Sequence, residues 1–347
     1  MYPALAVHSA LTAKVTDVDT LWVGGEGGME GSLVKRQGIT FKSIPAAGVH
    51  GVGLITMPRN LTMLGRGVFA ARRILNEFKP DVLFFTGGYV AVPVALAGRS
   101  IPTLLFAPDI EPGLALKSLT RFADVIAVTT DQSQKFFNKK VLETGYPLRA
   151  DLALWDRQTA TQHLGISGER PVVLVFGGSK GARSINFAVM NNVRELLARF
   201  EIIHLSGELD WQMVRHTREQ LPMELAARYH ALPYLHDMGA ALAAADLVVS
   251  RAGASTLGEF PLFGLPAVLV PYPHAWRYQK VNADYLASRG AAVIMEDHRL
   301  NDDLLSTLNV LFENKNKLKS MRAAMFELSH PRAAEKIAGV LITLAGA

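Results

Sequence analysis

The stretch "PVVLVFGGSKGARSIN" (171–186) decides the fold class, because it passes from an apolar run through glycines into a helical pattern. The run 172–176 has no polar alternation, which is typical of a parallel strand buried on both faces. The loop 177–183 lets the backbone approach a ligand, and the helix from Ser184 offers unpaired N–H groups to an anion. The stretch therefore predicts a phosphate-binding strand–loop–helix unit, although it is neither a Walker A loop nor a GxGxxG fingerprint.

Short apolar runs followed by helical patterns recur on both sides of this unit. We expect strands at 20–23, 82–85, 103–106, 125–128 and 141–144, and again at 172–176, 202–205, 247–250, 267–270 and 292–295. Two such sets predict an α/β fold with two doubly wound parallel-sheet domains. The strand pattern lapses near 145–160, so we expect domains at 1–150 and 151–347. The final helix, about 331–347, is a candidate to pack back on the first domain.

The composition is that of a globular protein. Hydrophobic residues make up 49% of the 347 residues and charged residues 19%, which excludes a disordered chain. No apolar run is long enough to cross a bilayer, and the apolar start lacks the basic region and cleavage site of a signal peptide. The absence of cysteine excludes disulfides and thiolate chemistry and fits a cytoplasmic protein.

The net charge of +5 lies entirely in the first half of the chain. Residues 1–150 hold 16 Lys and Arg against 11 Asp and Glu, whereas residues 151–347 hold 20 of each. A basic excess favours a phosphate, a nucleic acid or an anionic membrane as partner. No basic tract is interleaved with aromatic residues, so we expect no nucleic acid. The segment 53–80 mixes apolar residues with four arginines, which suits either core packing or an anionic membrane surface.

The stretch 250–283 is the richest in candidate binding residues. A glycine turn, 252–254, follows a predicted strand, and Glu259 lies about one turn into the helix that begins near 255–256. A carboxylate in that position can accept hydrogen bonds from two ribose hydroxyls. Gln279 and Asn282, three positions apart on one helix face, can bind sugar hydroxyls, although either alone is typical of a solvated helix. Together these residues predict a nucleotide-sugar site.

Two further motifs carry weaker signals. "FTGGYVAVP" (85–93) is another strand–glycine–helix turn, in which the glycines can serve only to end the strand and turn the chain. The pair Asp17 and Asp19 resembles the Asp-x-Asp of metal-dependent sugar transferases, but it has no neighbouring ligands and fits a solvated loop. The histidines lack metal-ligand spacing. We therefore expect neither a structural metal nor a cofactor.

Six motifs together resemble the MurG family of UDP-sugar transferases. These are "YPALAVHSAL", "FTGGYVAVP", "GYPLRADL", "GGSKGARSIN", "SRAGASTLGE" and "PYPHAWRYQKVNA", in the family's order and at its spacing. The resemblance implies a GT-B architecture of two Rossmann-like domains facing a cleft. It implies an inverting, metal-independent transfer of N-acetylglucosamine from UDP-GlcNAc to undecaprenyl-linked lipid I. The enzyme would be a peripheral protein on the cytoplasmic side of the cell membrane, with 53–80 as its membrane-facing patch.

The resemblance also implies roles for single residues. For the donor, these are Arg149 and Ser179 at the diphosphate, Ala254, Ser255 and Thr256 under the phosphates, Glu259 at the ribose, Tyr234, Leu235 and Met238 around the uracil, and Gln279 with Asn282 at the sugar. For the acceptor side, they are Gly87, Gly88, Tyr89 and Asp109.

The sequence departs from the family pattern only on the acceptor side. The family begins with a strand and the loop Gly-Gly-Thr-Gly-Gly-His, whereas this sequence starts immediately after that histidine. We therefore expect Met1 to be an internal valine and the first domain to lack its first strand. The residues 106–109 replace the usual His-Glu-Gln-Asn, and Tyr146 replaces an asparagine. Asp109 and Glu111 then become the candidates for the general base.

Three alternatives to transfer onto lipid I stay open. The first is transfer of the sugar to another lipid acceptor, such as diacylglycerol. The second is a catalytically silent protein that binds nucleotide sugars. The third is a UDP-sugar epimerase on the same architecture, which would need acid and base carboxylates in the cleft.

Overall fold

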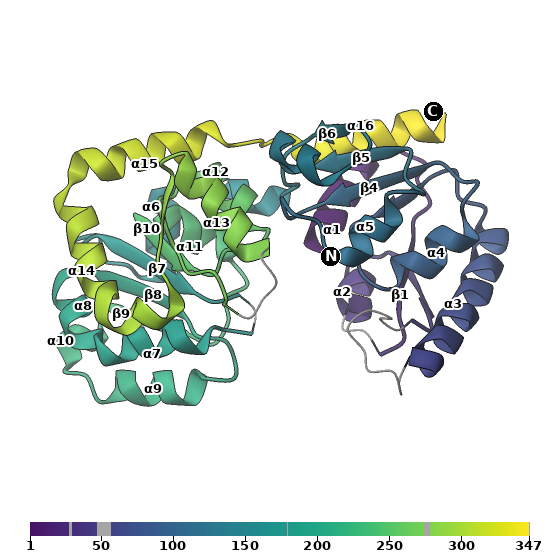
Figure 1. The fold of residues 1–347 in the computed structure, drawn as a ribbon. Coiled ribbons are helices and arrows are strands. Elements are labelled where there is room, and N and C mark those ends of the chain that lie inside the picture. The colour runs from purple at the N-terminus through teal and green to yellow at the C-terminus, as the bar shows by residue number, and fades with distance from the viewer. Residues whose placement is uncertain (28–29, 47–56, 179, 274–277, 347) are drawn as a thin grey trace. The chain divides into compact units, whose positions relative to one another are not determined.

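The computed structural model describes residues 1–27, 30–46, 57–178, 180–273 and 278–346. The chain divides into two compact units (Figure 1). The first unit consists of Met1–Leu148 together with Pro331–Ala347, and the second of Arg149–His330.

The first unit contains two parallel sheets among its described residues. The four-stranded sheet has the order β3 (Leu83–Phe85), β4 (Thr103–Ala107), β5 (Val125–Val128) and β6 (Val141–Glu143). The strands β1 (Leu21–Gly25) and β2 (Thr40–Ile44) form a separate parallel pair. Every residue of β4 is buried because strands flank it on both sides.

The helices of the first unit cover these sheets. They are α1 (Tyr2–Thr12), α2 (Glu30–Arg36), α3 (Met57–Phe78), α4 (Ala91–Ala97), α5 (Leu114–Leu119), the 3-10 helix η1 (Asp131–Phe136) and α16 (Ala333–Ala345). The helix expected at the start of the sequence is confirmed as α1, and it packs against α16 at the other end of the chain (Figure 1). Ala6 and Val7 of α1 and Ile337 and Leu341 of α16 are buried.

The second unit is built on one six-stranded parallel sheet. Its order is β12 (Ala292–Ile294), β11 (Ala267–Leu269), β10 (Leu247–Ser250), β7 (Val172–Phe176), β8 (Glu201–Leu205) and β9 (Tyr229–Leu232). The chain therefore builds the sheet outward from β7 to β9 and then returns to the other side of β7. The direction reverses between β7 and β10, and loops at such a reversal lead to opposite faces and leave a crevice between them.

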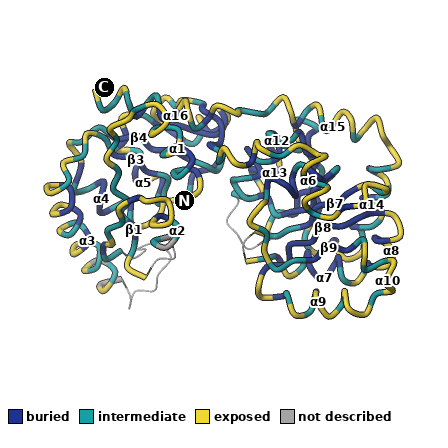
Figure 2. Tube along the Cα trace, turned by 180° about the vertical axis from the view of Figure 1, so that it is seen from behind, coloured by how far each residue is buried: buried dark blue, intermediate teal, exposed yellow. Residues whose placement is uncertain are grey.

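Helices lie on both faces of this sheet, and the buried residues concentrate along the strands (Figure 2). The helices are η2 (Ala150–Leu154), α6 (Arg157–Leu164), α7 (Arg183–Asn191), α8 (Val193–Arg199), α9 (Trp211–Glu219), α10 (Met223–Ala226), α11 (Met238–Ala244), α12 (Thr256–Phe263), α13 (Tyr278–Ser288), η3 (Asp297–Arg299), α14 (Leu300–Glu313) and α15 (Lys315–Glu327). The side chains of α7, α8 and α14 share one apolar core with β7 and β8.

The structure confirms all ten strands expected from the sequence and the α/β class with parallel sheets. Two strands were not expected, β2 and β9. In β9, which lies at a sheet edge, buried and partly exposed residues alternate, and in β2 only Ile44 is buried. The sequence criterion was a continuous apolar run, which such half-exposed strands do not have.

Candidate functional site

The two glycine motifs of the second unit meet at the point where the strand order reverses. Phe176 and Ser250, the last residues of β7 and β10, are register partners. The loops that follow them lead into the N-termini of α7 and α12, so the first turns of both helices begin from the same edge of the sheet. This edge of a parallel sheet is where α/β proteins bind ligands, and helix N-termini there favour anions.

Backbone conformation requires the glycines of the first loop, and close packing also requires Gly181. Gly178 and Gly181 have φ values of 92° and 77°, and the Gly181 N–H donates to the Gly178 carbonyl at 2.9 Å. A Cβ on Gly181 would overlap the carbonyl oxygen of Ser206. The loop therefore rests directly on the backbone that follows β8. Ser179, which the sequence assigns to the diphosphate, lies outside the described residues.

Glu259 lies in the first turn of α12, where its carboxyl is partly buried. Burial raises the pKa of Glu259 to about 7, although a hydrogen bond from Ser255 and the positive charge of Arg149 act in the opposite direction. The structure thus brings together Glu259, Ser255 and Arg149, three residues that the family resemblance assigns to the donor. A carboxyl with this pKa changes its charge near neutral pH.

The glycine turn before α12 is held by side-chain hydrogen bonds. Thr256 donates its hydroxyl to the Gly253 carbonyl at 2.7 Å. Asn282, which is fully buried on α13, donates to the Ala252 carbonyl at 3.2 Å. Gln279, on the same helix, accepts the Tyr272 N–H at 2.8 Å. The two amides expected at the sugar therefore also brace the segments after β10 and β11.

Of the residues expected around the uracil, Tyr234 and Leu235 lie between β9 and α11, and Met238 begins α11. Tyr234 is exposed and stacks edge-on with His236 at 5.0 Å between ring centroids. Leu235 and Met238 are partly exposed. The helix α11 packs against η2, which follows Arg149, and against α12, which carries Glu259. These contacts connect the segment 234–238 to the elements that hold the other donor-side residues.

Sequence reasoning missed Arg251, the first residue after β10. Its guanidinium donates to Ser184 Oγ at 2.7 Å and to the Val270 carbonyl at 3.1 Å, and it forms an ion pair with Asp297. It also lies 5.2 Å from the centroid of the Tyr272 ring. Arg251 therefore fastens the loop after β10 to the first turn of α7. The available signal was a basic residue directly between a buried strand and a glycine turn.

The acceptor-side residues gather at the carboxyl edge of the four-stranded sheet in the first unit. Gly87 and Gly88 follow β3 with φ values of 104° and 92°, and Tyr89 after them is exposed. Asp109 follows β4 and is partly buried, whereas Glu111 is buried with its carboxylate 3.9 Å from Lys117 Nζ. The same edge therefore holds the four acceptor-side residues and both candidates for the general base.

Two of the departures from the family pattern contact each other. Phe106 is fully buried in β4, and its ring meets the ring of Tyr146 edge-on with centroids 6.2 Å apart. Aromatic pairs favour this edge-to-face arrangement. The two positions thus form one apolar contact in this chain.

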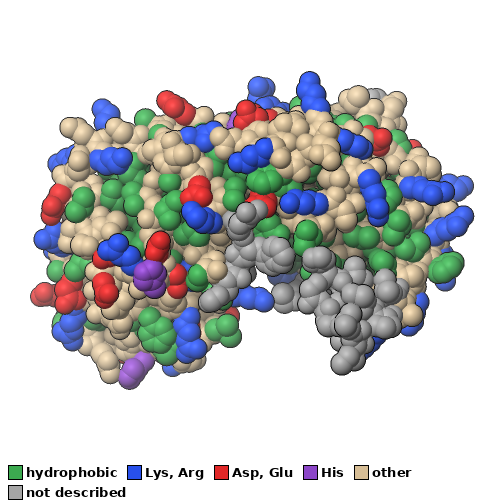
Figure 3. All heavy atoms as spheres, viewed as in Figure 1, with side chains coloured by type: hydrophobic (Ala, Val, Ile, Leu, Met, Phe, Trp, Pro, Cys, Tyr) green, Lys and Arg blue, Asp and Glu red, His purple; other side chains and the backbone are tan. Residues whose placement is uncertain are grey.

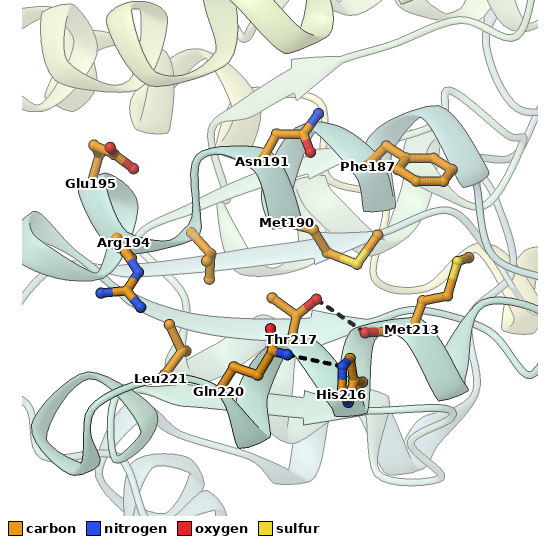
Figure 4. Close-up of a pocket in the computed structure, with 11 residues that line it drawn as sticks. Phe187, Met190, Asn191, Arg194, Glu195, Met213, His216, Thr217, Gln220 and Leu221 are labelled. Atoms are coloured by element: carbon orange, nitrogen blue, oxygen red, sulfur yellow. Dashed lines mark hydrogen bonds between the residues drawn. The ribbon is translucent and has the colours of Figure 1, made fainter.

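A cavity of about 530 Å³ lies elsewhere in the second unit, between α7 and α9 (Figure 4). Phe187, Met190 and Met213 line it, and His216 and Gln220 are hydrogen-bonded on its side formed by α9. None of the residues expected to bind the donor lines this cavity. Among the described residues, no group of three or more His, Asp or Glu side chains could hold a metal ion.

Two family models match this chain. Residues 1–128 match the model of the glycosyltransferase family 28 N-terminal domain, and residues 172–337 match that of the C-terminal domain.

Two curated relatives carry the same name, UDP-N-acetylglucosamine–N-acetylmuramyl-(pentapeptide) pyrophosphoryl-undecaprenol N-acetylglucosamine transferase. The protein from Roseiflexus sp. (strain RS-1) is 39% identical, with 99% of this chain and 92% of the relative covered. The protein from Desulforamulus reducens is 36% identical, with 97% of this chain and 93% of the relative covered.

Solved structures share the fold. MurG from Acinetobacter baumannii matches with a TM-score of 0.77 at 28% identity, covering 99% of this chain and 95% of that one. The calicheamicin glycosyltransferase CalG4 matches with a TM-score of 0.68 at 13% identity, covering 99% and 95%, which shows the fold alone. The chain belongs to glycosyltransferase family 28, within its MurG group, and has the GT-B fold of two Rossmann-like domains.

Proposed function

We infer that this chain transfers N-acetylglucosamine from UDP-GlcNAc to N-acetylmuramyl-(pentapeptide) pyrophosphoryl-undecaprenol, which converts lipid I to lipid II. It is a UDP-GlcNAc-dependent hexosyltransferase of peptidoglycan synthesis. The observation that carries this inference is the nearly full-length similarity to transferases named for this reaction. The intact loops at the reversal point of the second unit support it.

The donor diphosphate would bind at the two loops after β7 and β10. The first turns of α7 and α12 offer backbone N–H groups there, and helix N-termini stabilise negative charge. Arg149, with Ser179 and the turn residues Ala254, Ser255 and Thr256, would add further donors. Because UDP leaves with its negative charge, these groups would stabilise the transition state as well as the bound substrate.

The ribose and the sugar would lie along α12 and α13. Glu259 has the chemistry to accept hydrogen bonds from both ribose hydroxyls when ionised. Tyr234, Leu235 and Met238 would surround the uracil. Gln279 and Asn282 would form hydrogen bonds with the N-acetylglucosamine. Their hydrogen bonds to the Tyr272 N–H and the Ala252 carbonyl hold the nearby turns in place.

The acceptor hydroxyl would attack the anomeric carbon in line with the departing UDP, which inverts the configuration. Deprotonating that hydroxyl calls for a general base within hydrogen-bonding reach. Asp109 is partly exposed and fits this role better than Glu111, which is buried beside Lys117. Gly87, Gly88 and Tyr89 would bind the acceptor beside it.

The exposed side of α3 supports association with an anionic membrane on the cytoplasmic side. Arg59, Arg66, Arg72 and Arg73 are exposed, and so is Phe69, at 78%. Figure 3 shows basic and apolar side chains together on the surface around α3. Basic residues attract anionic lipids while an apolar side chain inserts at the interface. Within the described part of the chain no helix could span a membrane. Residues 53–56, at the start of the segment 53–80, lie outside that part.

The inference is tested by incubating the protein with UDP-GlcNAc and purified lipid I while quantifying lipid II and UDP. We expect one UDP released for each lipid II formed. In parallel reactions, diacylglycerol replaces lipid I as the acceptor. Transfer to diacylglycerol alone would reassign the acceptor, and binding of UDP-GlcNAc without any transfer would identify a silent binding protein.

A further inference from the structure

A chain of four buried polar side chains runs beneath the glycine loop of the second unit. The Tyr229 hydroxyl lies 2.7 Å from His204 Nδ1, and His204 Nε2 lies 2.9 Å from Asn186 Oδ1. Asn186 Nδ2 donates to the Ser206 carbonyl at 2.8 Å and to the Asp210 carboxylate at 2.9 Å. His204, Asn186 and Tyr229 are fully buried. None of these residues belongs to the donor site described above.

Only one assignment of hydrogen-bond donors and acceptors fits these four side chains. A backbone carbonyl and a carboxylate only accept, so both must face the amide nitrogen of Asn186, and its oxygen must face His204. His204 Nε2 therefore carries the hydrogen, and Nδ1 accepts from the Tyr229 hydroxyl. Burial lowers the pKa of His204 to about 3, which keeps the ring neutral. The ring thus has one fixed tautomer, and every polar hydrogen along the chain has an acceptor.

The series of buried hydrogen bonds ends at the backbone that supports the glycine loop. The Ser206 carbonyl, which accepts from Asn186, is the atom that a Cβ on Gly181 would overlap. Gly207, with a φ of 75°, likewise leaves no room for a Cβ because it faces the Gly181 backbone. On its other side the turn is bonded to the end of β9, from Ser206 N to the Leu232 carbonyl and from Gly207 N to the Pro233 carbonyl, at 3.0 Å each. A shift of Ser206 would therefore shift Gly181.

We propose that His204, with Tyr229 and Asn186, is a positioning residue that holds the Ser206 carbonyl beneath the glycine loop and so sets the affinity for the donor diphosphate. The proposal rests on the proposed function, because it concerns the same loop. Backbone N–H groups bind phosphates well only when they are already oriented before binding. The buried hydrogen bonds supply that orientation through the Ser206 carbonyl.

The test compares UDP with UMP, because the difference between their affinities isolates the second phosphate. In the full-length wild type we expect UDP to bind more tightly than UMP in calorimetry without added metal. His204→Phe keeps the ring but removes both hydrogen bonds, and it should reduce the UMP-to-UDP ratio of Kd values about tenfold. Tyr229→Phe, which removes one hydroxyl, should reduce it about threefold. His204→Gln, which retains a donor and an acceptor, should restore most of the ratio.

Glu201→Gln is the matched control, because Glu201 is also buried on β8 but lies at its opposite end, bonded to Ser167 and His230. Both His204→Phe and Glu201→Gln should lower the Tm, while only the former changes the ratio. A general loss of folded protein weakens UMP and UDP binding equally and leaves the ratio unchanged. An unchanged ratio in natively folded His204→Phe overturns the proposal, and Tyr229→Phe decides it if His204→Phe does not fold. Failure of the wild type to bind UDP would instead contradict the proposed function.

Discussion

Arg149 lies close enough to Glu259 for its charge to act on the carboxyl, although the two residues are far apart in the sequence. Burial raises the pKa of Glu259 to about 7, and Arg149 together with the Ser255 hydroxyl limits the increase. Near neutral pH, the ribose hydroxyls of a bound UDP-sugar must therefore compete with a proton for this carboxylate. This relationship gives the proposed ribose contact a measurable pH dependence.

The affinity for UDP-GlcNAc should rise as the pH rises through about 7 and level off above it. Ribose hydroxyls donate to the ionised carboxylate, so the pKa of Glu259 is lower in the complex than in the free protein and binding releases a proton. Glu259→Gln should remove this dependence and weaken binding by about 1–3 kcal/mol. Calorimetry with UDP-GlcNAc avoids the terminal phosphate of UDP, which itself titrates in this range. A wild-type affinity that does not change with pH would contradict the ribose contact.

Removing the guanidinium of Arg251 should destabilise the second unit by about 3 kcal/mol, because it leaves the partly buried Asp297 without its counter-ion. Arg199→Ala provides the control. Arg199 forms an ion pair with Glu313 at 3.0 Å, but both side chains are more than half exposed, so its loss should cost under about 1 kcal/mol. Urea unfolding of Arg251→Ala and Arg199→Ala measures both values. Equal costs would show that Arg251 does not hold the loops together.

Glu201 should stabilise the protein at neutral pH and lose that effect in acid. Burial alone would raise the pKa of Glu201, but hydrogen bonds from Ser167 and His230 outweigh it and lower the pKa below the ordinary value of 4.5. A lowered pKa in the folded state gives stability that is present above the unfolded pKa and is lost as the pH falls through the folded value. The difference in unfolding free energy between wild type and Glu201→Gln should therefore shrink below about pH 4.5. A difference that stays constant between about pH 7 and about pH 4 would exclude this role.

Reversing two charges on α3 should weaken binding to anionic vesicles. Arg72→Glu with Arg73→Glu changes exposed residues that face anionic lipid in the proposed orientation, and added salt should weaken the wild type in the same direction. The control is Arg215→Glu with Arg218→Glu, which makes an equal change on the exposed side of α9. Co-sedimentation with anionic vesicles should show weaker binding for the α3 double variant than for the α9 double variant. Equal losses for both double variants would indicate a general effect of net charge.

Local patterns predicted most of the strands and the position of Glu259 on α12. Continuous apolar runs located β7 and β10, and the glycines after them marked where the chain must turn sharply. Glu259 could be placed one helical turn beyond the second glycine motif from spacing alone. These predictions depend on residues close together in the sequence, where the helical and strand periods apply.

The contacts of Arg251 and His204 could not be predicted in this way. Arg251 meets Ser184 and Asp297, which lie on elements before and after it in the chain. His204 lies between Tyr229 and Asn186 because β9 pairs beside β8 and α7 packs over them. Each contact depends on the strand order, which reverses between β7 and β10.

The sequence by itself therefore determined the α/β class, the positions of the main strands and the positions of the two glycine turns, since all of these are encoded locally. The tertiary structure alone decided that α1 is the helix against which α16 packs, that Arg149 acts on Glu259, and that buried hydrogen bonds support the glycine loop. The physical reason is that hydrogen bonds and charges act over a few ångströms in space. Which residues come that close depends on how the sheet is assembled, and the helical and strand periods of the sequence do not predict that assembly.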